Sequence, residues 1–299
     1  PQIVAANLGL HPDAVIVKTA DTDASGRDLG VGGGRTTVSI GAASQEACAE
    51  VRSKLLAVAS QMLQTPQDDL VLTQGRVEIR DRPGSGTTIQ TVIAQAELDH
   101  GPISGSGAFT APGIAAMPGC AAGHFIDAID IPVFAVHDCD VAVDPGTGKV
   151  EILAYRVIQD VGRALNPRAI HGQIQGGVTQ GIGYALHEEI TINAEGAFDQ
   201  TCFSSYRIPT ALDTLPIDYH LYEGAPSCGP LGTKGAGEVP ILNVGATIAC
   251  AVANAIGTPV NALPLTAPRV LGLIDGLSSG LELSHLSRHW HENTIAFSK

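Results

Sequence analysis

The sequence predicts an α+β fold of two lobes, each with a mixed β-sheet packed by helices. Apolar residues recur at helical spacing over 42–63 and 170–186, while 134–143 and 149–160 are strand-like runs joined by a turn. With 299 residues, of which 44% are hydrophobic and 16% charged, the chain can bury one large core or two ordinary ones. This composition excludes an intrinsically disordered chain.

Residues 1–100 form the first predicted lobe. Its expected elements are, in order, the end of an amphipathic helix at 2–9, a strand at 14–19, a glycine-dense loop at 30–37, a helix at 42–63 and a hairpin with strands at 71–72 and 77–79. The hairpin turn is Gln74-Gly75. The helix is expected to face the core with the residues Ala47, Val51, Leu55, Val58 and Met62.

Residues 101–128, rich in glycine, proline, serine and alanine, are the predicted crossing to a second lobe at 129–276. That lobe is expected to contain strands at 134–143 and 149–160 with a turn at 144–148, a helix from 166 to about 189, a glycine loop at 234–238, a helix at 240–256 and a short helix at 268–276. Each glycine inside the first of these helices costs about 1 kcal/mol in propensity, so we expect tight packing to compensate. Residues 277–299 are a polar C-terminal tail.

Charge and composition disfavour several classes of function. The chain has 17 Lys and Arg against 30 Asp and Glu, a net charge of -13 that would repel nucleic acid and anionic membranes. The longest apolar run, 241–257, is shorter than a membrane span and contains asparagines, so no such span is predicted. The first residue is a proline without a preceding methionine or a signal sequence, which suggests a fragment.

The cysteine spacing fits neither zinc nor iron-sulfur motifs. The even number of six cysteines would allow disulfides, but a chain with this apolar fraction favours reduced, buried thiols in a cytoplasmic protein. No residue of this chain is therefore assigned as a metal ligand. The sequence contains neither a dinucleotide-binding motif nor a phosphate-loop motif.

Two glycine-rich loops remain as the candidate site. The first contains Gly33, Gly34, Arg35, Thr36 and Thr37, and the second contains Lys234, Gly235, Ala236, Gly237 and Glu238. Glycine lets backbone amides approach a polyanionic ligand, and threonine hydroxyls and an arginine fork add donors suited to phosphate. A glutamate in such a loop can act as a general base. Taken alone, either loop could also be an ordinary tight turn.

Taken in order, several segments resemble the molybdenum hydroxylases, the xanthine dehydrogenase and aldehyde oxidase family. The resemblance is to the second molybdopterin-binding half of the large subunit and covers roughly residues 2 to 276. It is carried by the segments 21–23, 33–37, 141–150, 160–167, 171–177, 180–186, 206–210 and 234–238. Their joint occurrence is far more specific than any one of them.

The resemblance implies a role for each loop. Glu238 matches the glutamate that lies beside the molybdenum and acts as general base. Cofactor-binding positions are implied for Gly33, Gly34, Arg35, Thr36 and Thr37 along the pterin, and for Lys234, Gly235, Ala236 and Gly237 near the metal. Gly34 stands where relatives often have serine. Residues 206–210 could line a wall near the site, but structural packing as a strand is the favoured interpretation.

The resemblance also implies a fold of the molybdenum-cofactor-binding domain type and a set of partners. The expected cofactor is molybdopterin with molybdenum, in the cytosine dinucleotide form, shared with a missing upstream half. Iron-sulfur clusters and FAD belong on other domains or subunits. The expected location is cytoplasmic, with a small-molecule substrate and with neither nucleic acid nor membrane as a partner.

The implied activity is that of a molybdenum-dependent oxidoreductase, inactive as this chain alone. It would oxidatively hydroxylate an aldehyde or N-heterocycle with water as the oxygen source. Two alternatives stay open: a subunit of the carbon monoxide dehydrogenase type, and a cofactor-free assembly module whose loops dock a partner subunit.

Overall fold

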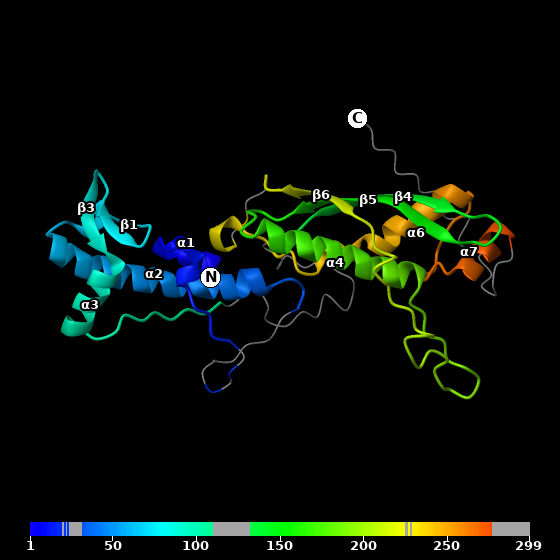
Figure 1. Cartoon of the computed structure of the whole chain (residues 1–299), viewed down its shortest axis with the longest axis horizontal. Coiled ribbons are helices and arrows are strands. Elements are labelled where there is room, and N and C mark those ends of the chain that lie inside the picture. Colours follow the sequence, from blue (N-terminus) through cyan, green and yellow to red (C-terminus); the bar gives the residue numbers. More distant parts are fainter. Residues whose placement is uncertain are drawn as a thin grey trace, which may run out of the picture. The chain divides into compact units, whose positions relative to one another are not determined.

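The computed structural model describes residues 1–19, 21, 23, 32–109, 132–224, 227 and 229–276 (Figure 1). Most of the predicted crossing at 101–128 and the whole predicted tail at 277–299 lie outside these residues. The α+β class is confirmed, since helices and two three-stranded sheets are present in the part described.

The chain divides into two compact units that interleave in sequence. Unit 1 comprises Pro1–Ala135, Ile158–Gln173 and His220–Val239, and unit 2 comprises Val136–Val157, Ile174–Tyr219 and Pro240–Lys299. The predicted lobes are continuous in sequence, so their boundaries at 1–100, 101–128 and 129–276 stay a prediction.

Unit 1 contains an antiparallel sheet packed by helices. The helices are α1 (Gln2–Leu8), α2 (Thr36–Leu63) and α3 (Ile89–Asp99), and the strands are β1 (Leu70–Thr73), β2 (Arg76–Ile79) and β3 (Arg82–Thr88) in the order β1-β2-β3. A core joins all of these helices to the sheet through Leu8, Leu55, Val77 and Val92. The predicted hairpin is confirmed, and Gln74 and Gly75 form its turn with positive φ angles of 48° and 74°.

The second sheet has the order β4-β5-β6, formed by β4 (Ala135–Val143), β5 (Val150–Asp160) and β6 (Ile217–Tyr222). The predicted turn between β4 and β5 is confirmed: the Asp144 amide donates to the Lys149 carbonyl, and the Gly146 amide donates to the Asp144 side chain. The helices that follow are α4 (Pro167–Leu186), α5 (Val239–Leu242), α6 (Val244–Ile256) and α7 (Ala267–Ile274).

Within unit 2, α6 packs against both the sheet and α4. The Cys139 thiol on β4 contacts the Thr247 carbonyl of α6 at 3.8 Å. An ideal Cβ on Gly181 of α4 would lie 2.4 Å from the Cβ of Val244, so the Val244 side chain of α6 packs directly on the backbone of α4. The predicted compensation of helix glycines by packing therefore holds at Gly181, whereas Gly172 and Gly176 face open space.

Several sequence predictions need correction. Residues 15–19 form no strand; Pro12–Ala14 is a 3-10 turn and Ile16 is 86% exposed, because β-branched residues form a strand only beside a partner. The predicted helix at 42–63 begins earlier, at Thr36, so Thr36 and Thr37 belong to its first turn. Residues 206–210 are not a strand. The elements β3, α3 and β6 were not predicted.

The predicted helix at 240–256 is divided at Asn243 into α5 and α6. By length and composition alone, Val239–Ile256 could cross a membrane, with a mean hydropathy of 1.8. Its residues Val244, Ile248 and Val252 are fully buried on one face, which is the pattern of a helix that packs in a protein core.

The described cysteines are free thiols. Cys48 and Cys139 are buried as expected, whereas Cys202 and Cys250 are exposed. Cys120 and Cys228 lie outside the described residues. Burial raises the pKa of the Cys139 thiol to about 11. The described part of the chain holds no cluster of three or more His, Cys, Asp or Glu side chains suited to a metal ion.

Candidate cofactor-binding site

The two glycine loops lie against each other within unit 1. An ideal Cβ on Gly34 would lie 3.7 Å from the amide nitrogen of Gly237 and 3.9 Å from that of Glu238. An ideal Cβ on Gly235 would lie 2.1 Å from the carbonyl oxygen of Gly34. Backbone packs directly on backbone here, so a side chain at position 235 would push the loops apart.

The first loop turns into α2 through two glycines with left-handed backbone. Gly33 has a φ of 61° and Gly34 a φ of 68°, which other residues adopt only with strain. Position 34 therefore carries glycine for a backbone reason. Arg35, the N-cap residue of α2, is exposed and makes no side-chain capping bond.

The start of α2 has unsatisfied hydrogen-bonding capacity. The Thr36 hydroxyl oxygen is buried and has no hydrogen-bond partner among the described residues. The first turn of any α-helix also leaves amide groups without intrahelical acceptors, and its dipole favours an anion. A buried orphan hydroxyl beside helix-terminal amides is the donor set that a phosphate group needs.

The second loop is anchored at its start by Lys234. The Lys234 ammonium lies 2.6 Å from the Asp160 carboxylate at the end of β5, and both side chains are about one-twentieth exposed or less, at 5% and 4%. The Lys234 amide also donates to the Val161 carbonyl at 3.0 Å. Asp160 was not among the predicted site residues, although it begins one of the segments that carry the resemblance.

The far end of this loop is held by Gln173 of α4. Its side-chain amide donates to the Gly237 carbonyl at 2.9 Å. Gln173 was also missed, and its only signal in the sequence was its place in the segment 171–177. Glu238, the next residue in the loop, is exposed, and its carboxylate makes no hydrogen bond or ion pair with any described residue.

All ten predicted site residues therefore come from two adjacent segments of one unit: Gly33, Gly34, Arg35, Thr36 and Thr37 from the first loop and the start of α2, and Lys234, Gly235, Ala236, Gly237 and Glu238 from the second loop. Their individual roles in catalysis and cofactor binding stay predictions. A group placed over this junction would meet backbone amides, a hydroxyl and one carboxylate.

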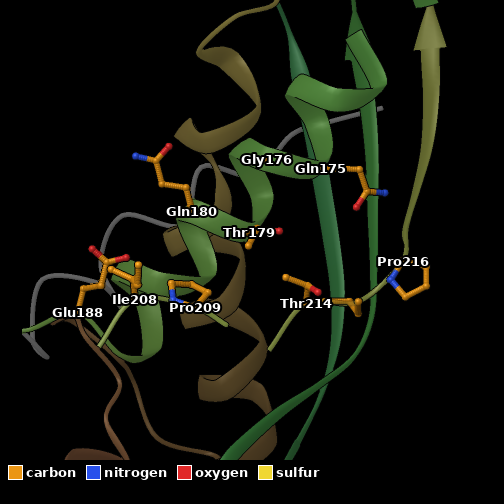
Figure 2. Close-up of a pocket in the computed structure, with 10 residues that line it drawn as sticks. Gln175, Gly176, Thr179, Gln180, Glu188, Ile208, Pro209, Thr214 and Pro216 are labelled. Carbon is orange, nitrogen blue, oxygen red and sulfur yellow. The ribbon is translucent and has the colours of Figure 1, made fainter. Parts of the chain in front are cut away.

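A separate open groove of about 840 Å³ lies in unit 2 (Figure 2). Its lining residues are Gln175, Gly176, Thr179, Gln180, Glu188, Ile208, Pro209, Thr214, Leu215 and Pro216. The Tyr206 hydroxyl donates to Glu188 there, and this bond raises the pKa of Tyr206. None of the predicted cofactor-binding residues lines the groove.

A family model described as a molybdopterin cofactor-binding domain matches residues 1–215. The chain belongs to this family. The resemblance to the large subunits of xanthine dehydrogenases and aldehyde oxidases is thereby confirmed.

Individual relatives agree with that membership. This molybdopterin-binding chain is 32% identical over 280 residues to the 6-hydroxypseudooxynicotine dehydrogenase complex subunit gamma of Paenarthrobacter nicotinovorans, covering 93% of the chain and 34% of the relative. It is 28% identical over 274 residues to the carbon monoxide dehydrogenase large chain of Hydrogenophaga pseudoflava, covering 90% and 32%. The crystal structure of quinoline 2-oxidoreductase from Pseudomonas putida 86 matches with a TM-score of 0.79 and 25% identity, covering 91% and 34%.

The molybdopterin-binding chain thus spans about a third of the length of the relatives that it matches. The family match at 1–215 includes the first glycine loop, and an alignment covering 93% of the chain includes both loops.

Proposed function

We propose that this chain is the C-terminal molybdopterin-binding portion of a molybdenum hydroxylase. In this proposal the enzyme oxidatively hydroxylates an aldehyde or an N-heterocycle, with water as the oxygen source. The observation that carries the proposal is the contact between the loop of Gly34 and the loop of Glu238, in a chain of the molybdopterin-binding family. Quinoline, named for one similar structure, is itself an N-heterocycle.

The residues present fit a phosphate-bearing cofactor. The unpartnered Thr36 hydroxyl and the first amides of α2 would bind its phosphate oxygens, and the exposed Arg35 guanidinium would add a charged donor. Gly235 and Gly237 carry no side chains, so the amides at these two positions can approach the pterin. We propose the cytosine dinucleotide form of molybdopterin, with further contacts from the upstream half of the subunit.

Glu238 is the proposed general base. When bound, the molybdenum cofactor supplies a Lewis acid and a two-electron acceptor. The Glu238 carboxylate oxygen accepts the proton of the water that attacks the substrate carbon. Because this carboxylate has no partner among the described residues, it is available to take that proton. We further propose a cytoplasmic enzyme with iron-sulfur clusters and FAD on other domains or subunits.

Replacement of Glu238 in the assembled holoenzyme tests the proposal. Glu238→Gln should lower kcat by about 100-fold or more, the usual size of a general-base contribution, with molybdenum content unchanged. Glu195→Gln, at an exposed glutamate outside both loops, is the matched control and should keep normal turnover. Normal turnover in Glu238→Gln would remove Glu238 from the mechanism.

Two alternatives are separated by direct measurements. The similarity to a carbon monoxide dehydrogenase large chain makes carbon monoxide oxidation the second candidate. Parallel assays with carbon monoxide, aldehydes and N-heterocycles distinguish these reactions. A stable complex that contains no molybdenum or pterin would instead support a cofactor-free assembly module.

A further inference from the structure

We propose that the buried ion pair of Lys234 and Asp160 is a positioning pair: it anchors the start of the loop that carries Glu238, and so positions the Glu238 carboxylate. The inference rests on the proposed function, because it assigns Lys234 to the placement of the base rather than to cofactor binding. Its evidence is a chain of contacts from the end of β5 to the second glycine loop.

The pair itself is almost fully buried. The Lys234 ammonium lies 2.6 Å from one Asp160 carboxylate oxygen, and the other oxygen accepts a hydrogen bond from the Gly162 amide at 3.1 Å. The Lys234 ammonium also lies 5.9 Å from the ring centroid of Phe134. Because the Lys234 side chain is only 5% exposed and its ammonium is already paired with Asp160, the ammonium is directed into the protein and away from a ligand above the loop.

The backbone around the pair is fixed to the end of β5. The Lys234 amide donates to the Val161 carbonyl at 3.0 Å, and the Arg163 amide donates to the Gly232 carbonyl at 2.9 Å. Gly162 and Thr233 form an antiparallel bridge. Gly162 has a φ of 60°, and an ideal Cβ on it would lie 2.4 Å from the Gly232 carbonyl oxygen. Residues 232–234 are thus held against the residues that follow β5 by two backbone hydrogen bonds and a close backbone contact.

This anchor controls Glu238 through a short stretch of backbone. Only Gly235, Ala236 and Gly237 separate Lys234 from Glu238, and the Gln173 side chain holds the Gly237 carbonyl. The Glu238 carboxylate is exposed and has no partner of its own among the residues described, so the backbone of the loop is what positions it. Release of Lys234 would therefore move the base without touching its side chain.

The test uses the assembled holoenzyme carrying Lys234→Met, which removes the ammonium but keeps a long side chain. Turnover per bound molybdenum should fall about 100-fold, the loss expected for a catalytic group misplaced by about 1 Å. KM should change by less than about threefold, because the substrate contacts are not altered. Amide hydrogen exchange of residues 235–238 should become faster. Lys234→Arg should recover part of the loss, since it keeps the charge.

Combining Lys234→Met with a second substitution separates a positioning role of Lys234 from a general loss of stability. In the presence of Glu238→Gln, Lys234→Met should cause no further loss of the residual turnover, because a positioning residue acts only through the group that it positions. The double variant Lys234→Met/Asp160→Leu leaves no unpaired buried charge. It should assemble with molybdenum and show the same loss of turnover and the same faster exchange.

The matched control is Lys54→Met, which breaks an exposed ion pair with Glu50 on α2. Exposed pairs contribute little, so its turnover should stay within about twofold of the parent. Parent-like turnover and exchange in Lys234→Met would overturn the inference. Loss of pterin from Lys234→Met would identify Lys234 as a cofactor ligand. Failure of the double variant to assemble would show that the pair is purely structural. Either result would also overturn the inference.

The results that would reject the proposed function differ from those that would reject the positioning pair. A parent complex without molybdenum, or a fully active Glu238→Gln variant, would reject the hydroxylase proposal. The hydrogen-exchange comparison of parent and Lys234→Met would still decide whether the pair holds the loop.

Discussion

Gly34 and Gly235 bring two loops, about two hundred residues apart in sequence, into direct backbone contact. A Cβ on Gly235 would lie 2.1 Å from the Gly34 carbonyl oxygen, far inside any normal contact distance. Because the atom in the way belongs to the backbone, no side-chain rotation can relieve the clash. This contact is what places the carboxylate-bearing loop beside the start of α2.

Gly235→Ala is therefore expected to separate the loops. The overpacking should destabilise unit 1 by about 1–3 kcal/mol, and the holoenzyme should contain less molybdenum. Unfolding curves and metal analysis measure the two effects. Gly32→Ala is the control, because a Cβ there meets nothing within 4 Å. Parent-like stability and molybdenum content in Gly235→Ala would show that the two loops can separate freely.

The glycines of α4 should respond to alanine in opposite directions. Gly181→Ala would place its Cβ 2.4 Å from Val244 of α6 and should lower the free energy of unfolding by about 1–3 kcal/mol. Gly176→Ala meets no atom within 4 Å and should raise it by about 0.5–1 kcal/mol through helix propensity. Thermal unfolding of the two variants measures both changes; equal effects would contradict the close packing of α4 on α6.

The burial of His137 should make the free energy of unfolding of unit 2 fall as the pH decreases. Burial lowers the pKa of its imidazole from 6.5 to about 4, and its Nδ1 lies 3.0 Å from the Tyr155 hydroxyl. As the pH falls from 6.5 to about 4, the unfolded chain binds a proton at this histidine that the folded chain does not. The folded state therefore loses stability across this interval.

His137→Gln should flatten that part of the pH dependence. Denaturant unfolding at several pH values measures the free energy of unfolding for both proteins. His11→Gln, at a histidine whose side chain is 76% exposed, serves as the control. A parent-like slope in His137→Gln would mean that other groups cause the acid sensitivity.

Much of the local structure could be predicted from the sequence. The hairpin around Gln74-Gly75 and the turn at 144–148 depend on residues within a few positions of each other. The helix α2 ends at Leu63 as its periodicity predicted. Both glycine loops were also recognised, because their composition and the resemblance point to the same residues.

Other features depend on partners that are distant in sequence. Residues 15–19 have the composition of a strand, but no described strand lies beside them, so they are not part of either sheet in the described part of the chain.

The sequence by itself determined the family, the α+β class and the two loops that form the candidate site, because these follow from local patterns and from the order of short segments. Only the tertiary structure decided that Asp160 buries the Lys234 ammonium and that Gln173 holds Gly237. The partners in these contacts are 74 and 64 residues apart. Such pairs are chosen by packing and by the need to satisfy buried polar groups, which no local pattern records.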